Sequence, residues 1–133
     1  MKLYRVVALI VGASLSAVAQ DLTDLHKYES AVQSAHERND TETEAAMLFH
    51  VGRLRQKQAE KDCAPDECAR LKQQGIDAYE KALKLSPMSA GTINNLALLY
   101  AANGNTGQAS KWFVRQFRQR RRNHCIHPLR FPK

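Results

Sequence analysis

The chain is most regular in residues 75–113, GIDAYEKALKLSPMSAGTINNLALLYAANGNTGQASKWF. Apolar residues recur there at the three- and four-residue spacing of an amphipathic α-helix. Two groups of helix breakers, Ser86-Pro87 and Asn103-Gly104-Asn105, divide the stretch into helical runs. We therefore expect one helix to end before the first group, a second to cover residues 90–102, and a third to run from about 106 to 121.

The residues before this stretch predict where its first helix begins, and they predict two earlier helices of the same kind. Pro65 suits the first turn of a helix over 65–85, because its missing N–H costs nothing there. The segment Thr41–Glu44 has the order of a capping box and indicates the start of a helix that continues to about residue 61. A helix over 23–38 should end at Asn39-Asp40. No strand pattern follows residue 20, so the fold class is predicted to be all-α, with about five antiparallel helices.

Each expected helix has an apolar face, and these faces predict the core. In the first two, it comprises Leu25, Tyr28, Val32, Ala35, Ala45, Leu48 and Val51. In the last two, it comprises Ile93, Leu96, Leu99, Tyr100, Ala109, Trp112, Phe113 and Phe117. We expect these faces to bury one another as the helices pack.

The spacing of the apolar and small residues is more specific than helical periodicity alone. Ile93-x2-Leu96-Ala97-x2-Tyr100 followed by Ala109-x3-Phe113 resembles the tetratricopeptide repeat pattern. Gly75-x3-Tyr79-x2-Ala82 and Pro87 are similar to the second helix of a preceding repeat. The resemblance implies antiparallel hairpins stacked as a short solenoid, with small residues where helices cross and aromatic residues between layers. It also implies a noncatalytic protein-binding scaffold without a cofactor.

The pattern departs from the family between residues 52 and 75. Leu48-x2-Val51-Gly52 can serve as the first helix of the earlier repeat, but Arg55 stands where the family has an aromatic residue. The interval to Gly75 exceeds the family spacing by about 11 residues. We interpret the excess as lengthened helices with a protruding tip.

The tip contains Cys63 and Cys68, separated by a short segment with a proline. A chain reversal there can bring two Cα atoms within the roughly 4.4–6.8 Å that a disulfide requires, so we expect these residues to be bonded as a local staple. A redox role is the weaker alternative, because the spacing differs from Cys-x-x-Cys.

The family resemblance implies that partners bind on a concave face formed by the first helix of each repeat. An Asn on that face can donate to and accept from a peptide backbone, although a solvated polar face is an equal alternative. Tetratricopeptide proteins that recognise a C-terminal carboxylate have Lys and Asn at the positions of Phe49 and Arg53. This difference argues against recognition of a C-terminal carboxylate here. The expected groove residues are Phe49, Arg53, Asn94, Asn95, Leu98 and Ala102.

Charge is distributed unevenly along the chain. The 133 residues have a net charge of +7 and a pI near 9.6, yet residues 81–133 contain ten basic residues and no acidic one. This end could bind an anionic lipid or another polyanion, or could simply be a solvated basic face. Nucleic acid is not an expected partner outside the cytoplasm. The candidate anion-binding residues are Lys111, Arg115, Arg118, Arg120, Arg121 and Arg122.

The first residues have the outline of a signal peptide. Lys2 and Arg5 precede an uncharged apolar run, and Ala17-Val18-Ala19 supplies a small-x-small cleavage pattern. We expect cleavage after Ala19 and export to the periplasm, with an uncleaved anchor as the alternative. The expected organisation is a signal peptide over 1–19, an N-terminal helix over 20–40, repeats over 41–122 and a disordered basic tail over 123–133.

The C-terminal end lacks the capping helix that solenoids usually have. About two and a half repeats remain after cleavage, so we expect a partner or self-association through Trp112, Phe113 and Phe117 to cover this end, unless the sequence is truncated or altered here. His124, Cys125 and His127 could offer three metal ligands, but we expect no metal site because the tail has no helical period. The sequence contains no nucleophile elbow or phosphate-binding loop, so no enzyme activity is expected.

Overall fold

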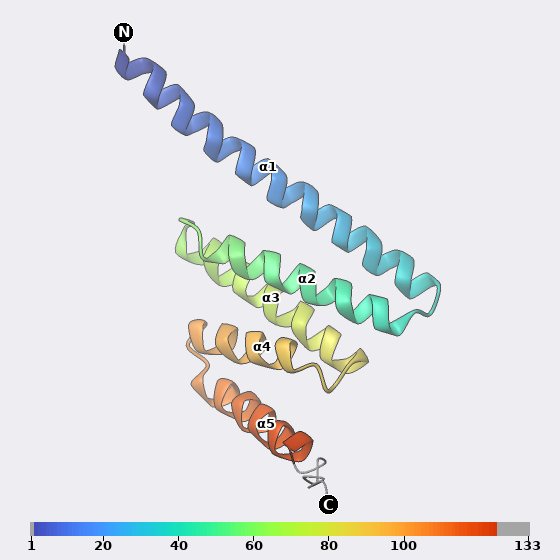
Figure 1. Cartoon of the computed structure of the whole chain (residues 1–133). Helices are drawn as coiled ribbons and strands as arrows, with labels where there is room; N and C mark the ends of the chain where they lie inside the picture. Colours follow the sequence, from blue (N-terminus) through green and yellow to red (C-terminus); the bar gives the residue numbers. More distant parts are fainter. Residues whose placement is uncertain (1, 125–133) are drawn as a thin grey trace, which may run out of the picture.

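The structure is a computed structural model that describes residues 2–124, and within these residues it contains helices and turns without a strand. Figure 1 shows the helices lying side by side in chain order, with the N-terminal helix at one edge and the C-terminal helix at the other. Their bounds are α1 Lys2–Glu37, α2 Thr41–Ala59, α3 Pro65–Leu85, α4 Ala90–Ala102 and α5 Thr106–His124. The predicted all-α fold class with five helices is confirmed.

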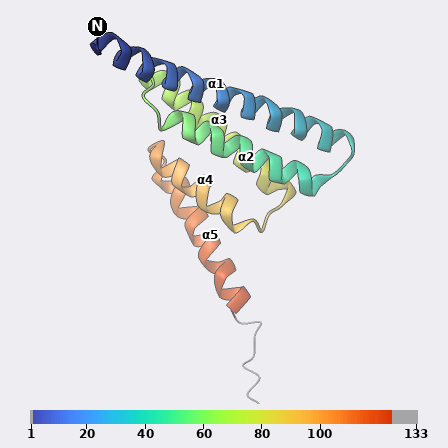
Figure 2. The same cartoon turned by 45° about the horizontal axis from the view of Figure 1, so that its top comes forward.

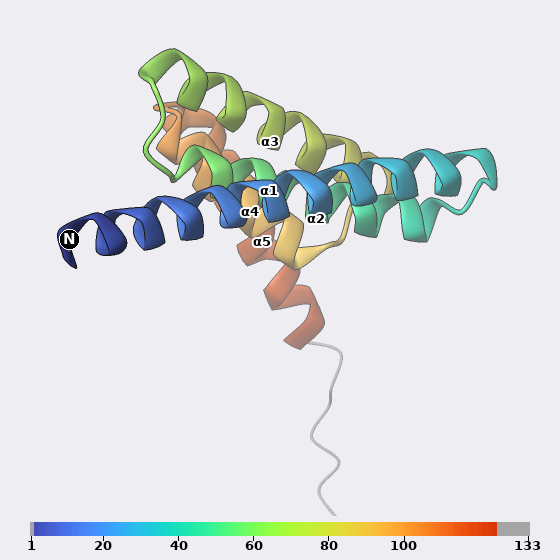
Figure 3. The same cartoon turned by 90° about the horizontal axis from the view of Figure 1, so that it is seen from above.

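Consecutive helices pack against each other, and α2 also contacts α4. In the view of Figure 2, the hairpin formed by α4 and α5 is seen apart from the longer hairpin formed by α2 and α3. Seen from above, α1, α2 and α4 overlap while α3 lies to one side (Figure 3). The arrangement is a short array of stacked antiparallel hairpins, with α1 packed on the outside of α2.

The turn signals of the sequence fix several helix ends. The bounds of α3 and α4 agree with the expected ranges, because Pro65 occupies the first turn of α3 and the side chain of Ser89 caps α4 by accepting from the Thr92 N–H. Between α1 and α2, Asn39 adopts a left-handed conformation with φ 53°. Gly104 does the same between α4 and α5, with φ 79°, a region that glycine enters without steric cost.

Three expected boundaries are wrong. Helix α1 begins at Lys2 instead of residue 23 and continues through Ala19, since no proline interrupts residues 2–37. The cap of α2 is Asp40, whose Oδ1 accepts from the Thr43 N–H at 3.0 Å, in place of a Thr41–Glu44 box. Helix α5 extends to His124, so the expected tail at 123–133 begins with two helical residues.

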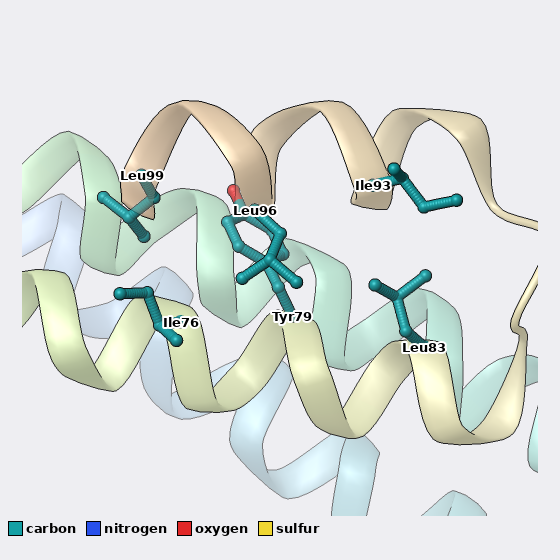
Figure 4. Close-up of a cluster of buried hydrophobic side chains, with 6 residues drawn as sticks. All are labelled: Ile76, Tyr79, Leu83, Ile93, Leu96 and Leu99. Carbon is teal, nitrogen blue, oxygen red and sulfur yellow. The ribbon is translucent and has the colours of Figure 1, made fainter. Parts of the chain in front are cut away.

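The main core lies between α3 and α4. Figure 4 shows three side chains from each helix facing one another: Ile76, Tyr79 and Leu83 from α3, and Ile93, Leu96 and Leu99 from α4. A smaller cluster joins α1 to the α2–α3 hairpin through Leu25, Val51 and Ala78, with Tyr28 and Val32 packed against it. The apolar faces predicted for α1, α2 and α4 therefore contribute to the core.

Small residues allow α2, α3 and α4 to approach closely. A Cβ built on Gly52 would lie 2.6 Å from Tyr79 Cε1, and one built on Gly75 would lie 2.7 Å from Leu99 Cδ2. Ala97 and Ala109 are also buried. These are positions at which the tetratricopeptide resemblance implies small residues.

The α2–α3 tip has the expected form. Helices α2 and α3 contain 19 and 21 residues, compared with 13 in α4 and 19 in α5, and the turn that joins them forms the tip of the hairpin. Cys63 and Cys68 lie at disulfide distance, with Cα atoms 5.7 Å apart. Arg55, at the family's aromatic position, instead donates to Glu29 Oε1 of α1 at 3.2 Å.

The last helix departs from the expected packing. Phe113 was expected to fill the gap between layers, but it is exposed together with Phe117, because no described helix covers that side of α5. Trp112 packs against the α3–α4 core. Cys125, His127 and the rest of the predicted disordered tail lie outside the described residues. Within the described part of the chain, no helix is long and apolar enough to span a bilayer.

Replacing Gly52 with Ala should destabilise the fold by about 1–3 kcal/mol, because the added methyl group overlaps the buried Tyr79 ring. Gly107→Ala is the matched control. It lies in α5 with nothing within 4 Å of the added Cβ, and should leave stability unchanged within about 1 kcal/mol. Urea denaturation of both variants measures the difference. Equal stability of the two variants would contradict the close packing of Gly52 on Tyr79.

Candidate functional site

A hollow of about 470 Å³ lies where α1, α2 and α4 meet. Helix α1 contributes Asp24 and Tyr28, and α4 contributes Asn95. The remaining lining residues come from successive turns of α2 and from its C-cap Glu60: His50, Arg53, Leu54, Gln56, Lys57 and Glu60. Of the predicted groove residues, Arg53 and Asn95 are brought together here.

Asn95, which lines this hollow, is held by a hydrogen bond to buried Tyr79. The Asn95 Nδ2 donates to the Tyr79 hydroxyl at 3.4 Å, and that hydroxyl donates to Gln56 Oε1 at 3.1 Å. Burial raises the pKa of Tyr79 to about 12, so the hydroxyl stays protonated at neutral pH. The hydrogen bonds of the described residues leave the Asn95 carbonyl oxygen free to accept one from a bound molecule.

The walls of the hollow carry both charges and aromatic rings. The Tyr28 and His50 rings are stacked, with centroids 4.8 Å apart. The Arg53 guanidinium lies 5.9 Å from the Phe49 ring centroid and remains exposed. Such a surface offers hydrogen bonds, a cation and flat apolar faces to a polypeptide.

Asp21 fastens α1 to α2 beside this hollow. Its carboxylate is buried and accepts from Lys57 Nζ at 2.9 Å and from Lys61 Nζ. The hydrogen bonds from Lys61 and then Lys57 hold the pKa of Asp21 below its usual value. Because α1 supplies one wall, these ion pairs help to maintain the shape of the hollow.

The other predicted groove residues lie elsewhere. Phe49 lines a second hollow of about 420 Å³ near the α3–α4 turn. Asn94 lines a third, of about 660 Å³, between α4 and α5. Leu98 is exposed on α4, and the carbonyl of Ala102 accepts from Lys72 Nζ at 3.1 Å. The six residues are thus distributed over α2 and α4 and do not form a single pocket.

All six candidate anion-binding side chains on α5 are exposed. Arg115 lies over the Trp112 ring and donates to the Pro87 carbonyl at 3.2 Å, while Arg121 lies over the Phe117 ring. The ion pairs found within the described residues lie between positions 21 and 70. Helix α5 therefore presents a basic surface that acidic side chains do not neutralise within the described part of the chain.

The described side chains contain no cluster of three or more His, Cys, Asp or Glu residues placed to hold a metal ion. The candidate set of His124, Cys125 and His127 lies outside the side chains that the structure describes. The chemistry that the hollows offer is hydrogen bonding, ion pairing and apolar contact.

The sequence reasoning missed Asp24, His50, Lys57 and Glu60 as lining residues. A usable signal was present, because His50, Arg53, Lys57 and Glu60 follow each other at intervals of three or four and so share one helix face. The part played by α1 was not predictable in this way, because it depends on the angle at which α1 crosses α2.

Comparison with known proteins adds no relative. The sequence matches no protein-family model, and neither the curated proteins nor the solved structures include a significant match.

Asp21→Asn should lower stability at neutral pH, because it removes the charge that Lys57 and Lys61 contact. The folded-state pKa is depressed, so the stabilisation is present above the unfolded pKa and is lost as the pH falls through the folded value. Urea denaturation should therefore separate wild type and variant at pH 7 and show the gap narrowing as the pH falls below the usual pKa of an Asp carboxyl. Asp62→Asn, an exposed carboxylate in the α2–α3 turn, is the control. A constant gap at all pH values would contradict the ion-pair account.

Proposed function

We propose that this chain is an exported adaptor of the tetratricopeptide type that binds a segment of another protein across α2 and α4. The observation that carries the proposal is the hollow between α1, α2 and α4, which places Arg53 and Asn95 of two successive hairpins on one surface. A partner segment lying along this surface would accept from Arg53, donate to the Asn95 carbonyl and pack on the Tyr28 ring, and it could continue past His50 to Phe49 in the second hollow. The role is binding, without catalysis or a cofactor.

The packing supports assignment to this type of repeat. Gly52, Gly75, Ala97 and Ala109 are buried where helices cross, and Tyr79 fills the space between α2, α3 and α4. These residues occupy the small and aromatic positions of the repeat pattern. The support comes from this correspondence of packing roles, together with the stacked hairpins.

Export is part of the proposal. The ion pairs of Asp21 attach α1 to α2 two residues after the expected cleavage site, so removal of residues 1–19 would leave this attachment in the mature chain. The pairing of Cys63 with Cys68 suits an oxidising compartment such as the periplasm. Both observations are compatible with the signal-peptide pattern of the first residues.

Site-specific photocrosslinking in intact envelopes tests the binding surface. With p-benzoylphenylalanine at Arg53 or at Leu98, we expect adducts with the same protein, because both positions are exposed on the proposed face. The control position is Gln73, exposed on α3. Equal yields from all three positions, or adducts from Gln73 alone, would exclude this face as the binding surface.

A second candidate function is binding to an anionic lipid or polyanion through α5. It is favoured by the exposed basic side chains of α5 and by the absence of acidic residues from position 81 onward. In this case the adaptor would be held at a charged surface, and binding would weaken with salt, which screens charges over about 10 Å at 0.1 M.

Replacing Arg120, Arg121 and Arg122 with Ser should reduce cosedimentation with phosphatidylglycerol vesicles several-fold and should also reduce the salt dependence. The matched control replaces three exposed basic residues elsewhere, Lys27, Arg38 and Lys81, with Ser. Vesicle binding that falls equally in both variants would indicate an effect of net charge and would count against a site on α5.

A further inference from the structure

The hollow between α4 and α5 combines exposed apolar and basic side chains. Phe113, Val114 and Phe117 are 39%, 50% and 59% exposed and line it together with Arg118, Arg120 and Arg121. Large aromatic side chains with this exposure in a concave site are typical of a binding surface. This surface is separate from the hollow between α1, α2 and α4 to which the proposed function refers.

The packing of α4 on the α2–α3 hairpin shows that the corresponding surface of a hairpin can bind a helix. Helix α4 packs on α3 through Tyr79 and Leu83, which are 0% and 5% exposed. A shift of 34 positions takes Gly75, Tyr79 and Leu83 of α3 to Ala109, Phe113 and Phe117 of α5. The face of α5 that corresponds to the helix-covered face of α3 is therefore uncovered within the described residues. The shape and chemistry of this face suit another helix.

The charges around the hollow define the partner further. Arg118, Arg120 and Arg121 border it, and residues 81–133 contain no acidic residue. A helix that places apolar side chains on Phe113 and Phe117 would bring its flanking residues against these arginines. Acidic flanking residues would pair with them, whereas basic ones would be repelled.

A second copy of the chain is a poor occupant. Two α5 helices facing each other would bring arginine clusters together. Over residues 19–37, where the side chains of α1 are described, Leu22 is its one exposed large apolar side chain, and a single Leu is too small to cover two Phe rings. A lipid surface is also disfavoured, because it is flat and would not enter the hollow between α4 and α5.

We propose that the α4–α5 hollow binds an acidic amphipathic helix of another protein, which packs there as α4 packs on the α2–α3 hairpin. Apolar side chains one turn apart contact Phe113 and Phe117, and carboxylates on either side pair with Arg118, Arg120 and Arg121. The bound helix takes the place of the next helix of the array.

The test uses a designed helical peptide of about 18 residues, with a Leu stripe at i, i+3, i+4 and i+7 and Glu on its flanks. Reference peptides replace Glu with Lys or scramble the stripe. Trp112, the only tryptophan of the chain, lies in α5 and reports binding through its fluorescence. We expect the Leu–Glu peptide to bind at least about tenfold more tightly than either reference, with affinity decreasing as salt increases.

Two variants and their controls locate the site. Phe117→Ser and Arg120→Glu should each weaken peptide binding about tenfold, while Leu22→Ser and Lys27→Glu, which change an exposed apolar and an exposed basic residue of α1, should not. Equal affinity for the three peptides would overturn the proposal. So would anionic-vesicle binding without peptide binding, or a dimer in light scattering that Phe117→Ser dissociates. None of these outcomes depends on crosslinking at Arg53 or Leu98.

Discussion

The close approach of α2, α3 and α4 around Tyr79 is the constraint on which the other features of this protein depend. The Tyr79 ring occupies space that opens because Gly52 has no side chain, and its hydroxyl connects Gln56 of α2 to Asn95 of α4. The same side chain therefore fills the core and positions the Asn95 amide on the surface that we propose binds a partner. Burial keeps its hydroxyl protonated, so it serves as a neutral donor to Gln56 and an acceptor from Asn95.

The sequence predicted the elements whose ends depend on local chemistry. Pro65, Pro87 and the Asn103–Asn105 turn gave correct bounds for α3 and α4, because these residues restrict the backbone wherever they occur. The start of α2 was misplaced by one cap residue, since Asp40 competed successfully with Thr41 for the exposed amides. Nothing in the pattern of α1 marked its start, because a continuous apolar run is compatible with a helix throughout.

The candidate site was harder to predict than the fold. Helices α2 and α4 are in contact, and Arg53 and Asn95 share a hollow, whereas Asn94 lines another. Whether Phe113 is a core or a surface residue depends on whether a further helix follows, and no local pattern contains that information. The basic residues are concentrated at the C-terminal end of the array, and the exposed aromatic side chains lie at the same end.

The helices pack mainly on their neighbours in chain order, and this limits the cooperativity of unfolding. Among the described helices, α1 packs on α2 and α5 packs on α4, so the two ends communicate only through the α2–α4 centre. In such quasi-one-dimensional arrays, stability is approximately a sum of neighbouring interfaces. The ends can therefore fray separately while the centre stays folded, and a single melting temperature describes this chain less completely than it describes a globular domain of equal length.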